Sequence, residues 1–433
     1  MSHRRVNRRT GAVAGAGAAV VALAAIVLPN ANASRNEPSG PETLTFTTAA
    51  RLGSDLAADL GADAAGWYFD DEEDRLVMNV LDGAAAEAAE SRGAEAVIVE
   101  NSTAELKAAT RTLGDTASIP GTAWSIDPRT NKVVVTADRT VTGARLAALR
   151  QVTDALDGTV TVRRSAGAFR PLTGNTGGTD GTGDTGTAPG GDTGSGNSTG
   201  DTGSSPGTGG SSGDAATGAV DGGDAVFGGG ARCSLGFNVT LGGAPAFLTA
   251  GHCGNASQTW TADAAGAQPL GTVVESQFPV GDFALVVYDD PAAPAPGTVD
   301  LKDGATREIT RVAEAGVGMR VQRSGSTTGV GEGTVTGLDA TVNYGNGDIV
   351  NGLIQTDVCA EPGDSGGAMF SGDAAVGLTS GGSGDCTRGG ETFFQPVTTA
   401  LEATGAQLGT GTGGDGGTVA AGTAGNGPRG SRR

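Results

Sequence analysis

One histidine and one serine in this 433-residue chain stand in motifs that suggest nucleophilic hydrolysis. His252 ends the run Thr-Ala-Gly-His, and the only other histidine is His3. Ser365 lies in the run Gly-Asp-Ser-Gly-Gly. A serine hydroxyl is a weak nucleophile that needs an adjacent base, for which a histidine is suited. The glycines suit a strained turn in which the backbone N–H groups of Gly363 and Ser365 would stabilise an oxyanion.

A carboxylate must fix the tautomer of that base, and we select Asp282. This residue precedes the strongly apolar run from Phe283 to Val287, where a buried acid would require a hydrogen-bond partner. Asp263, Asp289 and Asp290 are weaker candidates because each lies in a polar or turn-like stretch. Asp282 could instead be an ordinary capping residue at the start of a strand.

The first 33 residues are typical of a secretory signal peptide. They contain four arginines in the first nine positions, an apolar stretch of small residues over 11–28, and an A-x-A cleavage site ending at Ala33. The pair Arg8-Arg9 leaves twin-arginine export open. A permanent membrane anchor is the alternative, but the stretch is short and rich in Ala and Gly. We therefore expect a secreted, extracellular protein without a permanent anchor.

Export places the cysteines in an oxidising compartment, where they pair. All four fall in one segment: Cys233, Cys253, Cys359 and Cys386. Three pairings are possible, and joining the first to the second and the third to the fourth gives the shortest loops. No C-x-x-C spacing occurs, so a zinc site is disfavoured, and we expect neither a metal nor another cofactor.

Composition divides the remaining chain into four parts. Residues 34–172 are predicted to form a small α+β domain with two similar hairpin-and-helix units. Residues 173–218 are almost entirely Gly, Thr, Ser, Asp and Asn, which predicts a flexible linker because such a sequence cannot bury a core. Residues 219–408 alternate short apolar runs with Gly-rich turns, which favours an all-β pair of Greek-key barrels or a sandwich, with a closing helix over 397–408. Residues 409–433 are predicted to be a disordered Gly-rich tail.

The net charge of −20 disfavours binding to nucleic acid. Nothing in the sequence demands more than a monomer.

Residues 219–408 resemble the streptogrisin group of chymotrypsin-like secreted serine proteases. The matching stretches are 233–239, 248–253, 359–367, 378–384 and 392–397. The resemblance implies two six-stranded Greek-key β-barrels with the active site between them, and hydrolysis of peptide bonds through an acyl-enzyme. It assigns His252, Asp282 and Ser365 as the catalytic triad. It also implies the disulfides Cys233–Cys253 and Cys359–Cys386.

Residues 34–172 resemble a pro-region of the α-lytic protease and streptogrisin type, notably at 124–142 and in the ending Phe-Arg-Pro-Leu at 169–172. In that family the pro-region assists folding and inhibits the enzyme until it is cut away. The resemblance therefore implies a zymogen whose partners are protein or peptide substrates and its own pro-region. It also implies that an arginine neutralises Asp364, and Arg323 is our candidate.

The resemblance further places the S1 pocket, which holds the residue N-terminal to the cut bond (P1). Its expected lining consists of Ser380, Gly381, Gly382, Ala360, Glu361, Pro362 and Thr392. None of these is cationic, and Thr379 stands where glutamate-specific relatives carry histidine. We predict cleavage after large apolar residues, particularly Phe, Tyr, Leu and Met. Arg388 and Glu391 flank the pocket-forming segment, and their effect on the preference stays open.

That preference bears on processing, because the predicted linker contains no large apolar residue. The first such residue upstream is Leu172, after which we predict self-cleavage. The linker would then stay on the mature enzyme at first. Trimming near Ala219 by another protease stays open.

Overall fold

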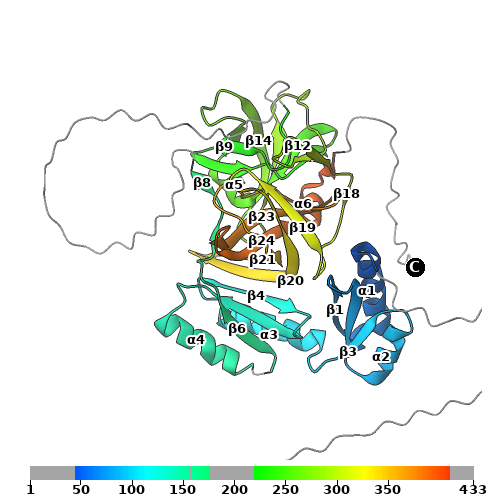
Figure 1. The fold of residues 1–433 in the computed structure, drawn as a ribbon. Coiled ribbons are helices and arrows are strands. Elements are labelled where there is room, and N and C mark those ends of the chain that lie inside the picture. Colours follow the sequence, from blue (N-terminus) through cyan, green and yellow to red (C-terminus); the bar gives the residue numbers. More distant parts are fainter. Residues whose placement is uncertain (1–43, 157, 176–218, 410–433) are drawn as a thin grey trace, which may run out of the picture. The chain divides into compact units, whose positions relative to one another are not determined.

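The structure, a computed structural model, describes residues 44–156, 158–175 and 219–409 (Figure 1). The predicted signal peptide with its cleavage site at Ala33, the linker from residue 176 onward and the tail from residue 410 onward lie outside the described residues. In the part of the chain that is described, no helix is long and apolar enough to cross a membrane.

The first unit of the α+β region combines two helices with a three-stranded sheet. Its elements are α1 (Phe46–Leu60), a short 3-10 turn (Gly61–Asp63), β1 (Ala64–Asp70), β2 (Arg75–Val80), α2 (Gly83–Glu90) and β3 (Glu95–Ile98). β1 and β2 form the predicted hairpin, and β3 runs parallel to β2. The core includes Leu56 from α1 and Leu76 and Met78 from β2, all fully buried.

The second unit repeats the same order of elements. These are α3 (Thr103–Thr116), β4 (Thr122–Asp127), β5 (Lys132–Ala137), α4 (Gly143–Asp154) and β6 (Val160–Arg164). β4 and β5 form the second predicted hairpin, and β6 is parallel to β5. Helix α3 begins with a capping box in which Ser102 and Glu105 satisfy each other's backbone N–H groups. The prediction of two similar hairpin-and-helix units is thus confirmed.

The first β-barrel contains the strands from β9 to β15. They are β9 (Ala225–Gly228), β10 (Ala231–Ser234), β11 (Phe237–Leu241), β12 (Ala244–Thr249), β13 (Thr259–Thr261), β14 (Pro269–Gln277) and β15 (Phe283–Tyr288). Their hydrogen-bonded order is β11-β12-β15-β14-β13-β9-β10. The short helix α5 (Gly251–Ala256) follows β12.

The second β-barrel closes on itself. Its strands are β19 (Arg320–Gly325), β20 (Gly329–Gly345), β21 (Asp348–Thr356), β22 (Ala368–Ser371), β23 (Ala374–Asp385) and β24 (Gly389–Pro396). β19 pairs with β20 on one side and with β22 on the other, and β21, β24 and β23 complete the ring. The short strands β16 (Thr298–Asp300), β17 (Thr306–Glu308) and β18 (Arg311–Val312) precede it in the sequence.

The closing helix is shorter than predicted. Helix α6 spans Val397–Thr404 rather than 397–408, because Gly405 adopts the left-handed conformation with φ 69° and ends it. The next residues form β25 (Gln407–Leu408), which pairs with β11 of the first barrel.

Three strands of the N-terminal region pair with the barrels. β4 is antiparallel to β20, so β4, β5 and β6 extend the sheet of the second barrel. β7 (Arg170–Pro171) pairs with β23, and β8 (Gly174–Asn175) pairs with β10. The sequence assigned residues 173–175 to a flexible linker, but β10 offers an open edge that satisfies the backbone groups of β8.

Candidate active site

The structure brings His252, Asp282 and Ser365 together, although they come from three separate segments. His252 lies at the start of α5, Asp282 immediately precedes β15, and Ser365 lies in the loop before β22. The Nε2 atom of His252 is 2.7 Å from the Ser365 hydroxyl. Its Nδ1 atom is 3.0 and 2.9 Å from the two carboxylate oxygens of Asp282. An imidazole held in this way can take the serine proton while the carboxylate stabilises the charge that develops.

Burial and backbone contacts hold the acid and the base in place. The side chain of Asp282 is fully buried and that of His252 is 6% exposed. The backbone N–H of His252 also donates to Asp282 Oδ1, over 2.9 Å. A β-carbon at Gly251 would lie 1.9 Å from the Gln277 carbonyl oxygen, so only glycine allows α5 to approach the acid loop this closely.

The loop that carries Asp282 is anchored to the second barrel. The backbone N–H of Asp282 donates to the side-chain oxygen of Gln395 over 2.8 Å, and Gln395 lies on β24. Val280, in the same loop, exchanges backbone hydrogen bonds with Ile349 and Asn351 of β21. Sequence reasoning gave Gln395 no role. One signal could have identified it: Gln395 is the polar residue in the apolar run Phe-Phe-Gln-Pro. If that run is buried, its amide needs a hydrogen-bond partner.

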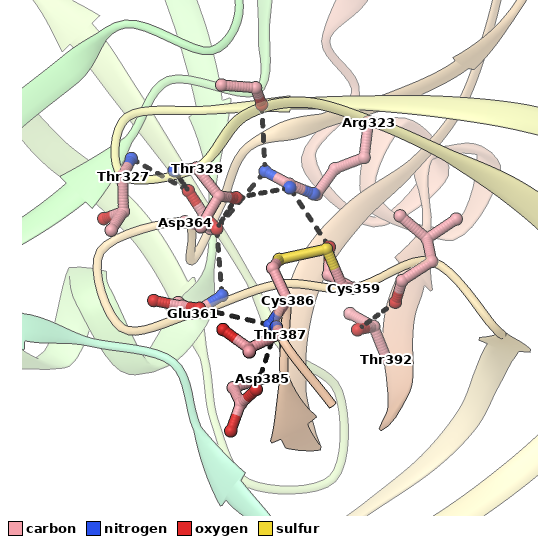
Figure 2. Close-up of a disulfide and its surroundings, with 12 residues drawn as sticks. Arg323, Thr327, Thr328, Cys359, Glu361, Asp364, Asp385, Cys386, Thr387 and Thr392 are labelled. Atoms are coloured by element: carbon pink, nitrogen blue, oxygen red, sulfur yellow. Dashed lines mark hydrogen bonds and ion pairs between the residues drawn. A yellow bond between two sulfur atoms is a disulfide. The ribbon is translucent and has the colours of Figure 1, made fainter. Parts of the chain in front are cut away.

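The loop that carries Ser365 is fixed by the neighbouring Asp364 (Figure 2). Asp364 and the candidate Arg323 are both fully buried, with Arg323 Nη1 3.3 Å from Asp364 Oδ2. The carboxylate also accepts the backbone N–H groups of Thr327, Thr328 and Glu361 and the Thr328 hydroxyl. Burial lowers the pKa of Arg323, while the negative charges of Asp364 and Glu361 act in the opposite direction.

The disulfides pair as the sequence predicts. Cys233 is bonded to Cys253, which ties β10 to the helix that carries His252. Cys359 is bonded to Cys386, which connects the segment before Ser365 to the end of β23 (Figure 2). No free cysteine remains. Both bonds therefore brace segments next to the site.

The end of the α+β region crosses this site as a peptide substrate would. The Leu172 carbonyl oxygen accepts the N–H of Gly363 over 2.5 Å, and the N–H of Leu172 donates to the Ser380 carbonyl over 3.3 Å. Pro171 stands opposite Gly381 in the ladder between β7 and β23. Gly363 has φ 103°, a conformation that turns its N–H toward the site at little strain for glycine.

Leu172 is 2% exposed, and its backbone N–H bonds to Ser380, one of the residues predicted to line S1. Gly382 stands opposite Arg170 in the same ladder. On the other side, Ala360 is buried, the Glu361 carboxylate accepts the N–H of Cys386, and the Pro362 carbonyl accepts the Thr327 hydroxyl. The Thr392 hydroxyl donates a hydrogen bond to the Val358 carbonyl, and the Thr379 hydroxyl donates one to the Gly367 carbonyl.

The two charged residues that flank the pocket have partners. The Arg388 side chain is 80% exposed and lies 3.6 Å from the Asp385 carboxylate. Glu391 is paired with Arg163 of β6, in the α+β region. Burial raises the pKa of Glu391 above its ordinary value of 4.5, although Arg163 lowers it in part. Among the described residues, no group of three or more His, Cys, Asp or Glu side chains could hold a metal ion.

Comparison with known proteins agrees with this geometry. Three family models match: Alpha-lytic protease pro N-terminal over residues 40–99, Alpha-lytic protease prodomain over 101–168, and Trypsin over 239–403. Streptogrisin-D of Streptomyces griseus is 48% identical over 410 residues, which cover 94% of this chain and 92% of that protein. The chain belongs to the streptogrisin family. It is a serine endopeptidase with a chymotrypsin-like fold and a prodomain.

Two further relatives match less of the chain. Streptogrisin-A of Streptomyces griseus is 43% identical over 314 residues, which cover 70% of this chain and 86% of that protein. Glutamyl endopeptidase 2 of the same organism is 49% identical over 184 residues, which cover 42% of this chain and 96% of that protein. The name of this last relative states a preference for glutamyl residues, whereas the streptogrisin names state none.

Proposed function

We propose that this streptogrisin-family chain is a secreted zymogen that cuts itself after Leu172 and then cleaves peptides after large apolar residues. The single observation that carries the proposal is the position of the Leu172 carbonyl. Its oxygen accepts the Gly363 N–H, beside a serine hydroxyl 2.7 Å from His252 Nε2. Secretion is supported by the two disulfides, which persist in oxidising compartments. A monomer without a permanent membrane anchor remains our expectation.

The reaction would proceed through an acyl-enzyme. His252 Nε2 takes the proton of Ser365 Oγ, which attacks the carbonyl carbon of the residue in S1. The oxyanion that forms would accept the N–H groups of Gly363 and Ser365, and one such donor is worth about 10²–10³ in rate. The tetrahedral intermediate expels the amine, which takes the proton from His252. Water then hydrolyses the ester on Ser365 by the same steps, while Asp282 holds the imidazole in the correct tautomer.

The preference at P1 follows from the charge of the proposed pocket. None of its seven lining residues is cationic, and the nearby Arg388 extends into solvent. His252 is already committed to the triad, and the only other histidine is His3. A glutamate at P1 would therefore lose its hydration without gaining a partner. We accordingly infer that this chain differs from Glutamyl endopeptidase 2 in accepting Leu, Phe, Tyr and Met.

The prodomain would serve both as a folding template and as an inhibitor. Its strand β4 pairs with β20 and so lies along the second barrel, whose closing pair, β19 with β22, is distant in the sequence and therefore slow to form. Its C-terminal segment occupies the substrate strand along β23 until the bond after Leu172 is cut. These contacts support a prodomain that stays with the enzyme during folding.

The test compares the secreted wild-type protein with the Ser365→Ala variant. We expect the wild type to yield a mature chain that begins at Thr173, and the variant to keep its prodomain. Intact-mass measurement and N-terminal sequencing distinguish the mature chain from the chain that keeps its prodomain. A Ser257→Ala variant is the matched control, since this half-buried serine, whose side chain bonds to the Thr259 backbone, lies outside the site, and the variant should be processed like the wild type. The proposal of self-cleavage is wrong if Ser365→Ala is cut at the same bond.

The P1 preference needs a separate measurement. Peptides that differ only at P1, with Leu, Phe, Glu or Lys, are compared by kcat/KM on the mature enzyme. We expect Leu and Phe to be preferred over Glu by at least about 10²-fold, because an unpaired buried charge costs several kcal/mol, and to be preferred over Lys as well. A preference for Glu or Lys would overturn the proposed pocket while leaving self-cleavage to be judged by the first test.

A further inference from the structure

The proposed cut lies where the chain passes from one β-barrel to the other. Before the cut, β7 pairs with β23 of the second barrel. After the cut, β8 is antiparallel to β10 of the first barrel, with Gly174 opposite Arg232 and Asn175 opposite Ala231. Counted forward from the cut bond, Thr173, Gly174 and Asn175 are the P1′, P2′ and P3′ residues. The protease domain therefore holds the two sides of that bond through different strands.

β8 lies close to the active site. Gly174 is buried, and a β-carbon at this position would lie 3.0 Å from Gly363 Cα and 3.3 Å from Arg232 Nε. The Thr327 hydroxyl accepts a hydrogen bond from Arg232 Nη2 over 2.7 Å, and the N–H of Thr327 donates to Asp364 over 2.9 Å. The backbone of Gly174 thus passes along a wall of the site that hydrogen bonds hold in place, and the lack of a side chain permits this close approach.

Cleavage would leave β8 attached to the protease domain. Among the described strands, β8 pairs with β10 and with no strand of the prodomain. Hydrolysis after Leu172 would make Thr173 the first residue of a chain that continues through the predicted linker to Ala219. The protease domain is fixed directly after this point, because Asn238 Nδ2 donates to the Val220 carbonyl over 2.7 Å. β8 would therefore remain covalently joined to the barrel with which it pairs.

Such a connection makes β8 an intramolecular ligand of β10. The effective concentration of a segment on a flexible linker reaches about millimolar, and cleavage breaks none of the hydrogen bonds between these two strands. An extended peptide binds an open strand edge through its backbone, so the leaving-group half of a substrate would need the same edge of β10. β8 and that half of a substrate therefore exclude each other.

We propose that β8 stays on β10 in the mature enzyme and competes in cis with the leaving-group half of protein substrates. The inference rests on the proposed cleavage after Leu172, which makes Thr173 the first residue. The edge of β10 is then an interaction surface for the enzyme's own N-terminal strand. Substrates that extend to P2′ and P3′ must displace β8, whereas substrates that end at P1′ need not. Trimming near Ala219 would release β8 and raise activity on proteins without changing the catalytic triad.

The test compares one enzyme before and after its linker is cut. A recognition sequence for an unrelated, sequence-specific protease is inserted after Gly200, and N-terminal sequencing establishes whether the secreted mature chain begins at Thr173. Two substrates share the acyl part Ala-Ala-Pro-Leu. One is its p-nitroanilide, whose leaving group ends at the P1′ position. The other is a fluorogenic peptide that continues with Ser-Ala-Ala-Ala and so extends past P3′.

Cutting the linker should favour the extended peptide selectively. The assay uses nanomolar enzyme, so that the freed N-terminal peptide dissociates. We expect kcat/KM for the extended peptide to rise at least about threefold more than kcat/KM for the p-nitroanilide, which corresponds to β8 occupying β10 in about two thirds of the uncut molecules or more. A smaller difference between the two substrates refutes the proposal.

A Gly174→Val variant assigns the effect to β8. The added side chain would meet Gly363, so β8 should leave β10 while the linker is intact. The uncut variant should therefore already show the substrate ratio of the cut enzyme, and a wild-type ratio would contradict the proposal. Gly178→Val is the matched control, since this linker glycine lies outside β8 and should keep the wild-type ratio. If Gly174→Val is not processed, the measurements before and after cutting decide alone.

Two failures are distinguishable. A mature chain that begins at Thr173 and cleaves both substrates, but whose substrate ratio does not change on cutting, refutes the competition by β8 and leaves the proposed function intact. In that case β8 pairs with β10 only in the zymogen. A mature chain that does not begin at Thr173, or that cleaves neither substrate, contradicts the proposed function itself.

Discussion

Replacing Arg323 by methionine should destabilise the protein strongly, because the change leaves the buried charge of Asp364 without its counterion. Both side chains are fully buried, and their closest atoms are 3.3 Å apart. Removing one partner of a buried ion pair lowers the free energy of unfolding by about 3–5 kcal/mol. Asp364 keeps the three backbone N–H groups and one hydroxyl that donate to it, so we expect the lower end, about 3 kcal/mol.

The measurement is the free energy of unfolding by guanidinium chloride, in a Ser365→Ala background so that the protein does not digest itself. The matched control is Arg311→Met, because Arg311 forms an ion pair with Asp373 in which both side chains are about half exposed. Such surface pairs contribute about 0–1 kcal/mol. A loss below about 1 kcal/mol for Arg323→Met, or a loss equal to that of the control, would refute the reasoning.

Three further predictions concern the supports of the site. Gln395→Leu would leave the buried N–H of Asp282 without a hydrogen-bond partner. We therefore expect kcat/KM to fall about 10- to 100-fold and the acidic limb of the pH–rate profile to shift. A change in kcat/KM below twofold contradicts this positioning role. Replacing Cys359 and Cys386 by serine opens a loop of 27 residues. The free energy of unfolding in guanidinium titrations should fall by about 3.5 kcal/mol, because the unfolded chain gains entropy. A loss below about 1 kcal/mol would show that this chain-entropy argument does not apply. Because the pKa of Glu391 is raised above 4.5, the folded zymogen binds more protons than the unfolded chain, and its stability should fall as pH rises from about 4.5 through the raised pKa. Glu391→Gln should flatten that dependence between pH 4 and 8, and an unchanged slope would assign it to other groups.

The parts of the site that the sequence predicts are those with local signals. His252 and Ser365 stand in short motifs, and each disulfide spans fewer than 30 residues. Asp282 is identified by an acid at the edge of an apolar run, where burial demands a partner. The two hairpins of the prodomain are also local, because strands joined by a short turn pair with each other.

The contacts that hold the site together depend on pairings distant in the sequence. Gln395 reaches Asp282 across 113 residues, and only the packing of one barrel against the other brings them together. β8 pairs with β10 although its own residues, Gly174 and Asn175, have the composition of a linker. No helix is predicted over Thr103–Thr116, where the structure has α3, for a different reason. Its capping box at Ser102 and Glu105 was a usable signal, but its apolar face consists of only a few spaced residues.

The geometry also separates cleavage from release of the enzyme. Hydrolysis after Leu172 would break one covalent bond and none of the hydrogen bonds between β4 and β20. It would equally leave the ion pairs of Arg320 with Asp71 and of Glu391 with Arg163. The new carboxylate would remain beside the Gly363 N–H, as the product of the reaction. Because those contacts do not depend on the bond that is cut, the prodomain can still block the cleft after processing. Active enzyme would therefore emerge when the prodomain dissociates or is itself degraded.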